Sequence, residues 1–491
     1  MVTPVKINAK VVVDNTGVEC ELPILITEEG PVEPLVDYLL LHRHNRSHSW
    51  SNRVVHATYL FIQYIHANRS FYSKPQLLFQ SFSQCLYVGS ISDDGIDPSG
   101  LYWLGWSTKT ANYLINSLTG LLDFIADRQG VQNINPIREA TPYEQSLNYA
   151  AWFRRNQHDF LGHIKNPGHM SAVKKARIIQ KRRTMVNIND DSIAFPERLF
   201  RKFYYEGVGG AKDIRVATRN QLILLLMHFA GCRESEALHL WIHDVFYDPN
   251  NPEVSIIQLY HPEEGKAPDG WRGSNGSTHR AAYLREKYSL TPRNRLTGTK
   301  HVGWKNTVVD NKDNYIRLYW FPQQAGVLFA QLWHNYIRYL LSIERNHPYA
   351  FVSFAKKNTG NPLTIKAFED AYQKSVYRIG EMPSKKNGLS THSHRHAMGR
   401  RLEKSGVGPH IIGKVLHHKS LNSQLPYTTP GIERVTKALT QGYSKLEMDK
   451  EQDETILLPN MDWDEITKYG YEDIDPDGLM TGFEPKLKGR I

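Results

Sequence analysis

Cysteine is scarce in this sequence. Its 491 residues include only three, Cys20, Cys85 and Cys232, and these stand far apart along the chain. An odd and scattered set excludes a disulfide framework, and it excludes a zinc module built from closely spaced cysteine pairs. The sequence therefore predicts a protein of a reducing compartment, and we expect it in the cytoplasm.

Long apolar runs are also lacking. No stretch reaches the roughly 18 consecutive apolar residues that a membrane-spanning helix needs. The first residues, Met1 to Lys6, lack the apolar core of a secretory signal peptide. We therefore expect a soluble chain without a membrane partner.

Acidic residues are outnumbered by basic ones. The chain has 60 Lys and Arg against 50 Asp and Glu, a formal net charge of +10 and a pI near 9.2. This balance favours a polyanionic partner. A hydrophobic fraction of 40% with 22% charged residues argues against wholesale disorder. The length predicts two or three domains.

The first part of the chain divides into an extended and a helical segment. Residues 1–30 alternate apolar and polar side chains around a turn, which predicts a hairpin or an extended N-terminal arm. Residues 31–130 carry apolar side chains at helical spacing in three stretches. Turn-forming residues at 89–100 separate two of these stretches. On its own, the pattern indicates a helical bundle without a stated role.

A basic connector at 131–190 is predicted to lead to a second domain at 191–444, which an acidic tail at 445–491 follows. The stretch from Lys165 to Arg183 predicts a basic helix or strap. Such a run is usually a solvated face, and the alternative is contact with phosphates between two domains. Its basic residues include Lys174, Lys175, Arg177, Lys181, Arg182 and Arg183.

The second domain mixes helices with a few strands. Residues Asn220–Phe229 are apolar nearly all round, which predicts a buried helix. Val254–Tyr260 is the clearest strand, and Tyr315–Phe321 is a second extended stretch. A long polar insertion, 261–314, separates them. Further helices are expected at 324–343 and 365–379.

An arginine stands directly after the buried helix. Gly231 ends that helix, Arg233 opens the next turn, and Glu236 follows three residues later. Two interpretations are open for this pair. It is either a structural ion pair, or an arginine that Glu236 orients so that its donors face a phosphate.

A second group of polar residues lies near the end of the domain. His392 and Arg395 are three residues apart, so a helix would place both on one face. His418 follows, and Tyr427 stands nine residues after it. With Arg233 these side chains suit a phosphate: guanidinium groups can grip its oxygens, imidazole can transfer a proton, and a phenol can attack.

A metal site is the competing interpretation of the histidines. His392, His394 and His396 alternate, and His417 and His418 follow. Alternate residues of a helix point in different directions, and no cysteine or carboxylate completes a ligand set. We therefore expect no bound metal, and we assign His394 and His396 to packing or hydrogen bonding.

These motifs in this order resemble the signature of the tyrosine recombinases, also called phage-type integrases. The usual pattern of that family is Gly-x-Arg-x-x-Glu, then His-x-x-Arg-His, then Leu-Gly-His, and a Tyr nine residues later. Here the corresponding residues, all within 215–430, are Gly231 to Glu236, His392 to His396, Leu416 to His418, and Tyr427. One departure concerns local geometry: His417 stands where the family usually has glycine.

The resemblance implies a fold and a partner. The fold would be mainly α with a small antiparallel sheet: an α+β catalytic domain at 191–444, preceded by a helical core-binding domain at 31–130. The protein would be a site-specific DNA recombinase or integrase of a mobile element or phage. Its partners would be double-stranded DNA and three further copies of itself, because the family acts as a homotetramer on paired sites.

The resemblance also implies roles for the site residues. Tyr427 would attack a DNA phosphate and form a 3′-phosphotyrosyl bond, while Arg233, Arg395 and His418 stabilise the charge of the transition state. His392 would accept a proton. The covalent link retains the phosphodiester energy, so no cofactor, ATP or divalent metal is required.

The family's general-acid lysine lies between the two arginine motifs. The candidates in this sequence are Lys266, Lys300, Lys305 and Lys312. We favour Lys305, because it stands at the end of an expected strand before Tyr315, and Lys300 is the second choice. That lysine would protonate the leaving 5′ oxygen.

Other functions share this chemistry or this fold. A type IB topoisomerase would relax supercoils as a monomer, and a DNA-binding accessory protein would keep the fold without cutting. Within the recombinase family, the length and the long insertion resemble the integrase-like proteins of bacterial gamma-mobile-trio elements.

Overall fold

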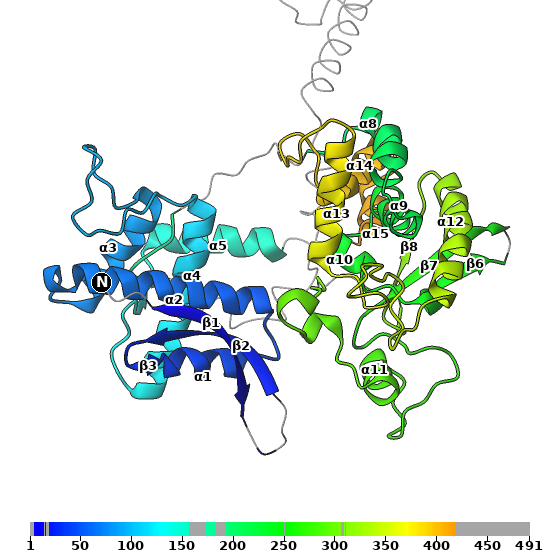
Figure 1. Cartoon of the computed structure of the whole chain (residues 1–491). Helices are drawn as coiled ribbons and strands as arrows, with labels where there is room; N and C mark the ends of the chain where they lie inside the picture. Colours follow the sequence, from blue (N-terminus) through cyan, green and yellow to red (C-terminus); the bar gives the residue numbers. More distant parts are fainter. Residues whose placement is uncertain are drawn as a thin grey trace, which may run out of the picture. The chain divides into compact units, whose positions relative to one another are not determined.

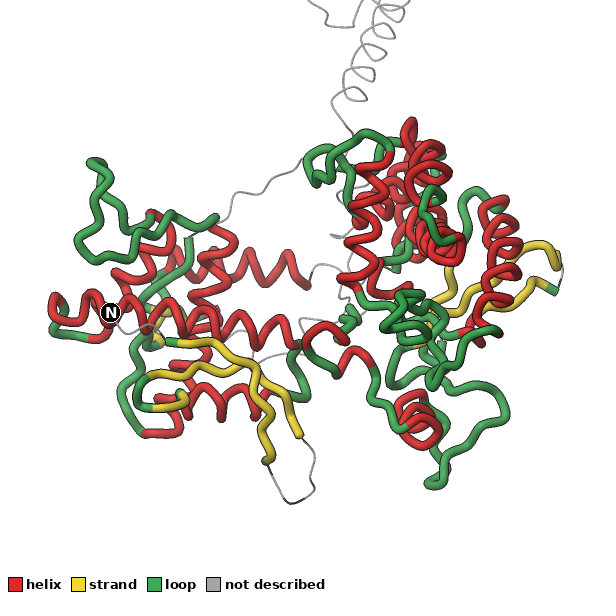
Figure 2. Tube along the Cα trace, viewed as in Figure 1, coloured by secondary structure: helices red, strands yellow, loops and turns green. Residues whose placement is uncertain are grey.

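The computed structural model is mainly helical, with three small antiparallel sheets among the residues it describes (Figures 1 and 2). These residues are 4–13, 15, 19–156, 173–182, 193–249, 251–305, 309 and 311–417. The chain forms two units, Met1–Asn187 and Ile188–Ile491, which we call unit 1 and unit 2. The fold class agrees with the mainly α, α+β architecture expected from the sequence.

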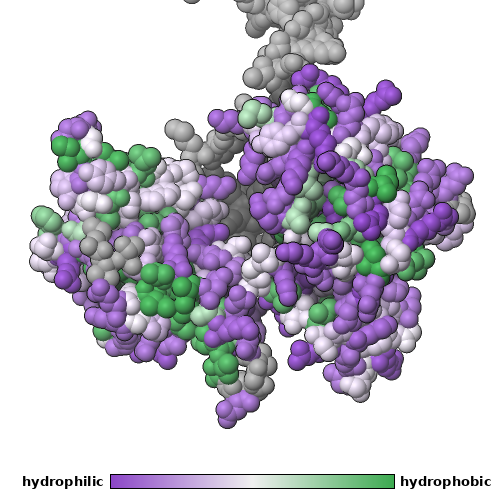
Figure 3. All heavy atoms as spheres, in the orientation of Figure 1, coloured by the Kyte–Doolittle hydropathy of each residue, from purple (hydrophilic) through white to green (hydrophobic). Residues whose placement is uncertain are grey.

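Unit 1 begins with the expected hairpin. Strand β1 (Val5–Val12) pairs antiparallel with β2 (Glu19–Thr27), and the short β3 (Gly30–Pro31) follows on the other side of β2. Residues 22–25 of β2 are all buried, so the hairpin contributes to the core of unit 1. Strand β1 is an edge strand, and exposed apolar side chains gather over it on the face drawn in Figure 3.

Four helices complete the core of unit 1. They are α1 (Glu33–His42), α2 (His48–Asn68), α3 (Pro75–Val88) and α4 (Thr108–Gln129). The sequence predicted three of them and missed α3. That helix buries apolar side chains at helical spacing, including Phe79, Phe82 and Leu86, against the rest of the bundle. The loop between α3 and α4 contains the turn residues expected at 89–100.

The described part of the predicted connector belongs to unit 1 and contains a small sheet. Strand β4 (Ile137–Glu139) pairs with β5 (Lys175–Arg177), beside helix α5 (Pro142–Asn156). Of the basic helix or strap expected at Lys165–Arg183, the structure describes residues 173–182, which contain a strand at Lys175–Arg177. The guanidinium of Arg177 donates to both carboxylate oxygens of Asp123 in α4, at 2.8 and 2.5 Å.

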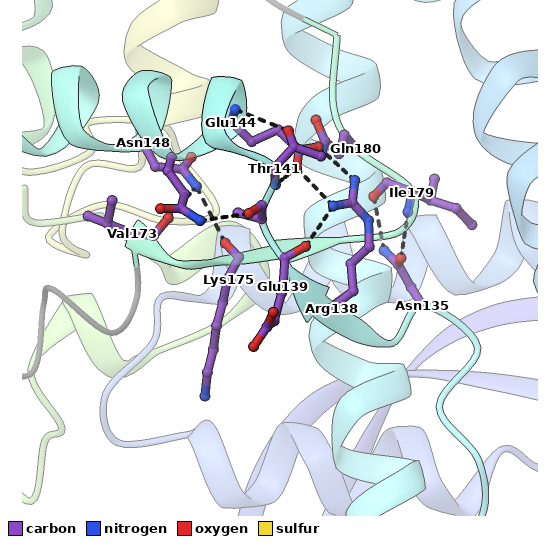
Figure 4. A network of polar contacts seen from close by, with 12 residues as sticks. Asn135, Arg138, Glu139, Thr141, Glu144, Asn148, Val173, Lys175, Ile179 and Gln180 are labelled. Carbon is purple, nitrogen blue, oxygen red and sulfur yellow. Dashed lines mark hydrogen bonds and ion pairs between the residues drawn. The ribbon is translucent and has the colours of Figure 1, made fainter.

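Polar contacts fasten this sheet to its surroundings (Figure 4). Arg138 donates to both carboxylate oxygens of Glu144 at 2.8 and 2.6 Å, which joins β4 to α5. Buried Asn135 exchanges two hydrogen bonds with the backbone of Ile179, at 3.0 and 3.2 Å. Lys174 and Lys175 remain exposed at the surface beside this network.

Unit 2 is built around a buried helix, α9 (Ile214–Phe229), which packs against α12 and α14. Its sheet has the order β6-β7-β8, and all neighbouring strands are antiparallel. The strands are β6 (Val245–Asp248), β7 (Asn251–Tyr260) and β8 (Tyr315–Leu318). The helices are α8 (Glu197–Lys202), the π-helix η2 (Phe203–Val208), α10 (Glu234–Ala237), α11 (Arg280–Tyr288), α12 (Gln324–Leu341), α13 (Ile365–Arg378), α14 (Thr391–Lys404) and α15 (Pro409–Val415).

The insertion between β7 and β8 is folded onto unit 2. It contains α11 and two short 3₁₀ turns, η4 (Arg293–Arg295) and η5 (Gly298–Lys300). The guanidinium of Arg280 forms a buried ion pair with Asp244, and it lies over the rings of Trp241 and Tyr260 at 4.0 and 4.3 Å from their centroids. The first half of the insertion is therefore anchored by a charge-assisted contact.

No helix in the described ranges is both long and apolar enough to cross a membrane.

Candidate active site

Arg233 lies at the turn between α9 and α10. Gly231 has a φ of +65°, and a Cβ at that position would lie 2.6 Å from Cδ2 of Leu416, so both the backbone and the packing require glycine. The backbone N–H of Arg233 donates to Oε2 of Glu236 at 2.8 Å, and its guanidinium donates to Oε1. Because Glu236 is fully buried, it fixes the direction of the guanidinium.

His392 and Arg395 both lie on α14, as their spacing predicted. The guanidinium of Arg395 donates to the carbonyl oxygens of Gly231 and Leu416. This buried side chain therefore joins three segments: α14, the turn that carries Arg233, and the end of α15. The two arginines of the predicted motif are brought to the same side of unit 2 through these contacts.

His392 lies within the electrostatic field of the other site residues. Burial, followed by the charges of His396, Arg395, Lys305 and Arg233, lowers its pKa to about 4. Its ring also meets that of His396 edge to face, with centroids 4.6 Å apart. At neutral pH the imidazole of His392 is therefore uncharged, which leaves it able to accept a proton.

Lys305 reaches the same place from the insertion. It lies in a loop, so the expected strand end is wrong, and the loop is held instead at Val302. The backbone N–H of Val302 donates to the carbonyl oxygen of Arg293 at 3.1 Å, and its own carbonyl oxygen lies 3.0 Å from Nε2 of His239. Burial, followed by the charges of Arg233 and Arg395, lowers the pKa of Lys305. A lysine with a lowered pKa gives up its proton more readily.

Trp304, next to Lys305, packs between two histidines. Its ring meets those of His239 and His261 at near-perpendicular angles, with centroids 5.5 and 5.6 Å apart. The guanidinium of Arg293 adds a second anchor, since it donates to the carbonyl oxygens of Leu238 and Leu363 at 3.0 and 2.6 Å. The position of Lys305 therefore depends on contacts between the insertion and the core.

His394 faces away from this group and into the core. Its Nδ1 lies 3.0 Å from Nδ1 of His228, and its Nε2 lies 2.9 Å from the hydroxyl of Tyr372. His228 in turn lies 3.2 Å from a carboxylate oxygen of Glu197. Burial lowers the pKa of both histidines, to about 4 for His228. The packing and hydrogen-bonding role expected for His394 agrees with these contacts.

Two members of the motif lie outside the described residues, namely His418 and Tyr427, as do Arg183 and the acidic tail at 445–491. The last described residue is His417, which is buried and directly follows the carbonyl group held by Arg395.

Sequence reasoning missed two residues of this region. Burial raises the pKa of Glu234, next to Arg233, to about 7, and its side chain is hydrogen-bonded to Thr391 at the start of α14. The imidazole of His417 lies in the field of Arg395 and Arg233. For His417 the sequence did carry a signal, the departure from glycine, whereas Glu234 offered none beyond its place next to Arg233.

In the described part of the chain, no three His, Cys, Asp or Glu side chains converge where they could hold a metal ion. The arrangement that is present, two oriented guanidinium groups with a lysine and a neutral histidine, suits a phosphate.

Several solved structures are similar to this chain at low sequence identity. A structure of XerH site-specific recombinase bound to palindromic difH substrate is similar at 14% identity and a TM-score of 0.45, covering 79% of this chain and 78% of that one. The Tn1549 transposon integrase in complex with transposon right end DNA is similar at 12% identity and a TM-score of 0.43, covering 84% and 98%. A structure of XerA recombinase has 12% identity and a TM-score of 0.31, covering 84% and 97%.

A comparison with curated proteins found no match. Residues 308–433 match the model of the phage integrase family. This span includes His392, Arg395, His418 and Tyr427, whereas Arg233 and Lys305 precede it. Residues 308–433 of the chain are therefore similar to the phage integrase family.

Proposed function

We propose that this protein is a site-specific DNA recombinase that cleaves and rejoins DNA strands through a 3′-phosphotyrosyl intermediate. The observation that carries the proposal is the contact of Arg395 with the carbonyl oxygen of Gly231, which brings α14 to the turn of Arg233. The charges of both arginines lower the pKa values of His392 and Lys305, in agreement with a shared site. Residues 308–433, which match the phage integrase family model, include Tyr427, and we assign the nucleophile to that residue. The formal charge of +10 suits double-stranded DNA as the substrate.

Cleavage exchanges one phosphate ester for another. The phenol oxygen of Tyr427 attacks the scissile phosphorus, its proton passes to His392, and the bond to the 5′ oxygen breaks. Lys305 gives a proton to that leaving oxygen, which becomes a 5′-hydroxyl group. Arg233, Arg395 and His418 bind the nonbridging oxygens, where negative charge develops. The 5′-hydroxyl of a second strand then reverses these steps, so no net hydrolysis occurs and no cofactor is consumed.

Strand exchange between two duplexes sets requirements beyond one active site. The proposal includes a homotetramer on paired DNA sites, because each of four strands is cut and rejoined once. Exposed Lys174 and Lys175 of unit 1 are suited to phosphate contacts away from the scissile position. The narrower resemblance to gamma-mobile-trio integrases stays a prediction.

A covalent-trapping experiment tests this function. Cleavage positions are first mapped by isolating protein-linked fragments of the DNA that flanks the gene. A duplex with such a position and a nick beside it then loses the short 5′-hydroxyl strand after cleavage, which traps the protein on DNA. Wild-type protein should accumulate this adduct and Tyr427→Phe should form none.

The remaining outcomes decide against the proposal. Wild-type protein that binds DNA without any adduct is a binding protein. Protein that forms adducts throughout a plasmid and relaxes it without paired sites is a topoisomerase. A recombinase should instead join two mapped sites and leave plasmids without them unchanged.

A further inference from the structure

His417 holds a strained backbone conformation at the candidate site. Its φ is +51°, in the left-handed region that side chains other than glycine rarely adopt. The residue is nevertheless buried, with 3% of its surface exposed. A glycine would adopt this conformation without strain, so the fold itself gives no reason for an imidazole here.

The side chain of His417 adds a second unfavourable feature. Among the described residues, its buried Nε2 atom has no hydrogen-bond partner. Buried polar atoms are nearly always paired in folded proteins, because an unpaired one loses its bonds to water without replacement. Backbone strain and an unpaired polar atom at the same residue are typical of a site that is completed by a ligand.

The surroundings of His417 indicate the charge of that ligand. Arg395 donates to the carbonyl oxygen of Leu416, directly before His417. Burial, followed by the charges of the Arg395 and Arg233 guanidinium groups, lowers the pKa of His417 to about 3. The imidazole is therefore neutral and carries one N–H. An anion between the two arginines would offset their field and accept that N–H.

We propose that His417 is a phosphate-binding residue, and that its Nε2–H donates a hydrogen bond to a nonbridging oxygen of the phosphate held by Arg233 and Arg395. The ligand class is a phosphodiester, so the assignment of the DNA phosphate rests on the proposed function. Glycine at this position would leave phosphate recognition to the two arginines and His418. His417 therefore adds a donor at the expense of backbone strain.

Replacement by glycine should separate stability from activity. His417→Gly removes both the strained side chain and the unpaired atom, so the melting temperature of the free protein should rise, by about 1–3 °C. The same variant loses a hydrogen bond to a charged group, so single-turnover cleavage of the nicked duplex should slow by roughly tenfold to a hundredfold. An unchanged cleavage rate, or a lower melting temperature, would overturn the proposal.

Ser289→Gly is the matched control. Ser289 has a similar φ of +54°, lies exposed at the end of α11, and donates its backbone N–H to carbonyl oxygens of that helix. Its replacement should raise the melting temperature by a comparable amount and leave the cleavage rate unchanged. If Ser289→Gly also slowed cleavage, the greater backbone flexibility of glycine at a position of positive φ would explain the effect of His417→Gly, and the phosphate contact would be refuted.

Inorganic phosphate gives a readout that does not depend on DNA cleavage. A site that binds phosphate should raise the melting temperature of wild-type protein as phosphate is added at constant ionic strength. His417→Gly should show a smaller rise, and Ser289→Gly the full rise. A His417-dependent rise without any DNA adduct would support the phosphate site and reject the recombinase function. If a DNA adduct formed and phosphate raised the melting temperature equally in all three proteins, the recombinase function would be supported and the phosphate contact of His417 would be refuted.

Discussion

Unit 1 and unit 2 bury different kinds of polar side chain. In unit 1 the buried polar residues are mostly hydroxyl groups, which bond within their own helix. Thr58 and Ser117, for example, donate to carbonyl oxygens four residues earlier, at 2.9 and 2.8 Å. In unit 2 they include arginines and histidines whose partners are distant in sequence. Arg219 bonds a residue 133 positions away and Arg395 one 164 positions away.

This difference reflects what each unit must hold in place. A buried charge is stable only where a specific partner faces it, since an unpaired one costs several kcal/mol. Each buried arginine of unit 2 therefore fixes the distance between two segments, and the candidate site lies where such segments meet. The described residues of unit 1 include no buried arginine, so that unit is held together mainly by apolar packing.

The largest expected effect is a loss of cleavage rate, which should follow replacement of a lysine in unit 2 and not of one in unit 1. Lys305→Ala in unit 2 should slow cleavage by about 10²- to 10⁴-fold through loss of the general acid. A substrate with sulfur at the 5′ bridging position should restore the rate, because a leaving thiolate needs no proton. Single-turnover cleavage of both substrates by the variant measures this. Lys175→Ala in unit 1 should cleave at the wild-type rate. For this variant, the slope of the logarithm of the DNA-binding constant against the logarithm of the salt concentration should be smaller by about one.

Two results would contradict that assignment. A Lys305→Ala variant that is equally slow on both substrates would have lost positioning rather than proton transfer. A Lys300→Ala variant with the same defect and the same rescue would move the general acid to Lys300.

The next effect concerns ion pairs. Asp244→Ala leaves Arg280 buried without its partner and should destabilise unit 2 by about 3–5 kcal/mol. Asp37→Ala in unit 1 breaks an exposed pair with Arg128 and should be close to neutral. Hydrogen exchange resolved by peptide reports each unit separately. A similar loss of protection in both units would remove the contrast between them.

The contrast between local contacts and contacts between distant segments explains which elements the sequence predicted. Helical spacing predicted α1, α2 and α4, because local apolar periodicity decides which face of a helix is buried, and an all-round apolar stretch predicted α9. It missed α3, although that helix buries Phe79 and Phe82. It did not predict the pairing of β4 with β5 either, since a pattern of basic residues carries no information about a strand partner.

The candidate site was predictable only as a set of residue types. Motif spacing selected Arg233, His392 and Arg395, whose side chains meet through α14 and the turn after α9. The contacts that hold Lys305 could not be predicted, because Val302 bonds Arg293 and His239 from separate segments. The pairing of His228 with His394, 166 positions apart, likewise depends on the tertiary fold.

Acid should destabilise unit 2 more than unit 1. Burial lowers the pKa of His228 and His347 to about 4 and that of His239 to about 3, against 6.5 in the unfolded chain. The unfolded state therefore takes up protons that the folded state does not. The contribution of each neutral histidine to the free energy of unfolding is complete above pH 6.5. It falls by at most about 1.4 kcal/mol per pH unit as the pH decreases from there toward the pKa of the folded state.

Urea unfolding at pH 7 and pH 5, followed by hydrogen exchange in each unit, measures this loss. His347→Gln removes one of these ionisable groups and should reduce the difference between the two pH values. In unit 1, burial also lowers the pKa of His56. Equal acid sensitivity of the two units would show that the buried histidines of unit 2 do not set its stability.

Helix caps should give the smallest effect, and an equal one in both units. The Ser107 hydroxyl accepts from the backbone N–H of Thr110 at 3.3 Å at the start of α4, and the Thr364 hydroxyl accepts from that of Ala367 at 3.1 Å at the start of α13. Each contact is local, so Ser107→Ala and Thr364→Ala should each cost about 1 kcal/mol in urea unfolding. A much larger cost at Thr364 would mean that even local contacts of unit 2 are coupled to its buried charges. Equal costs would confine the difference between the units to contacts between distant segments.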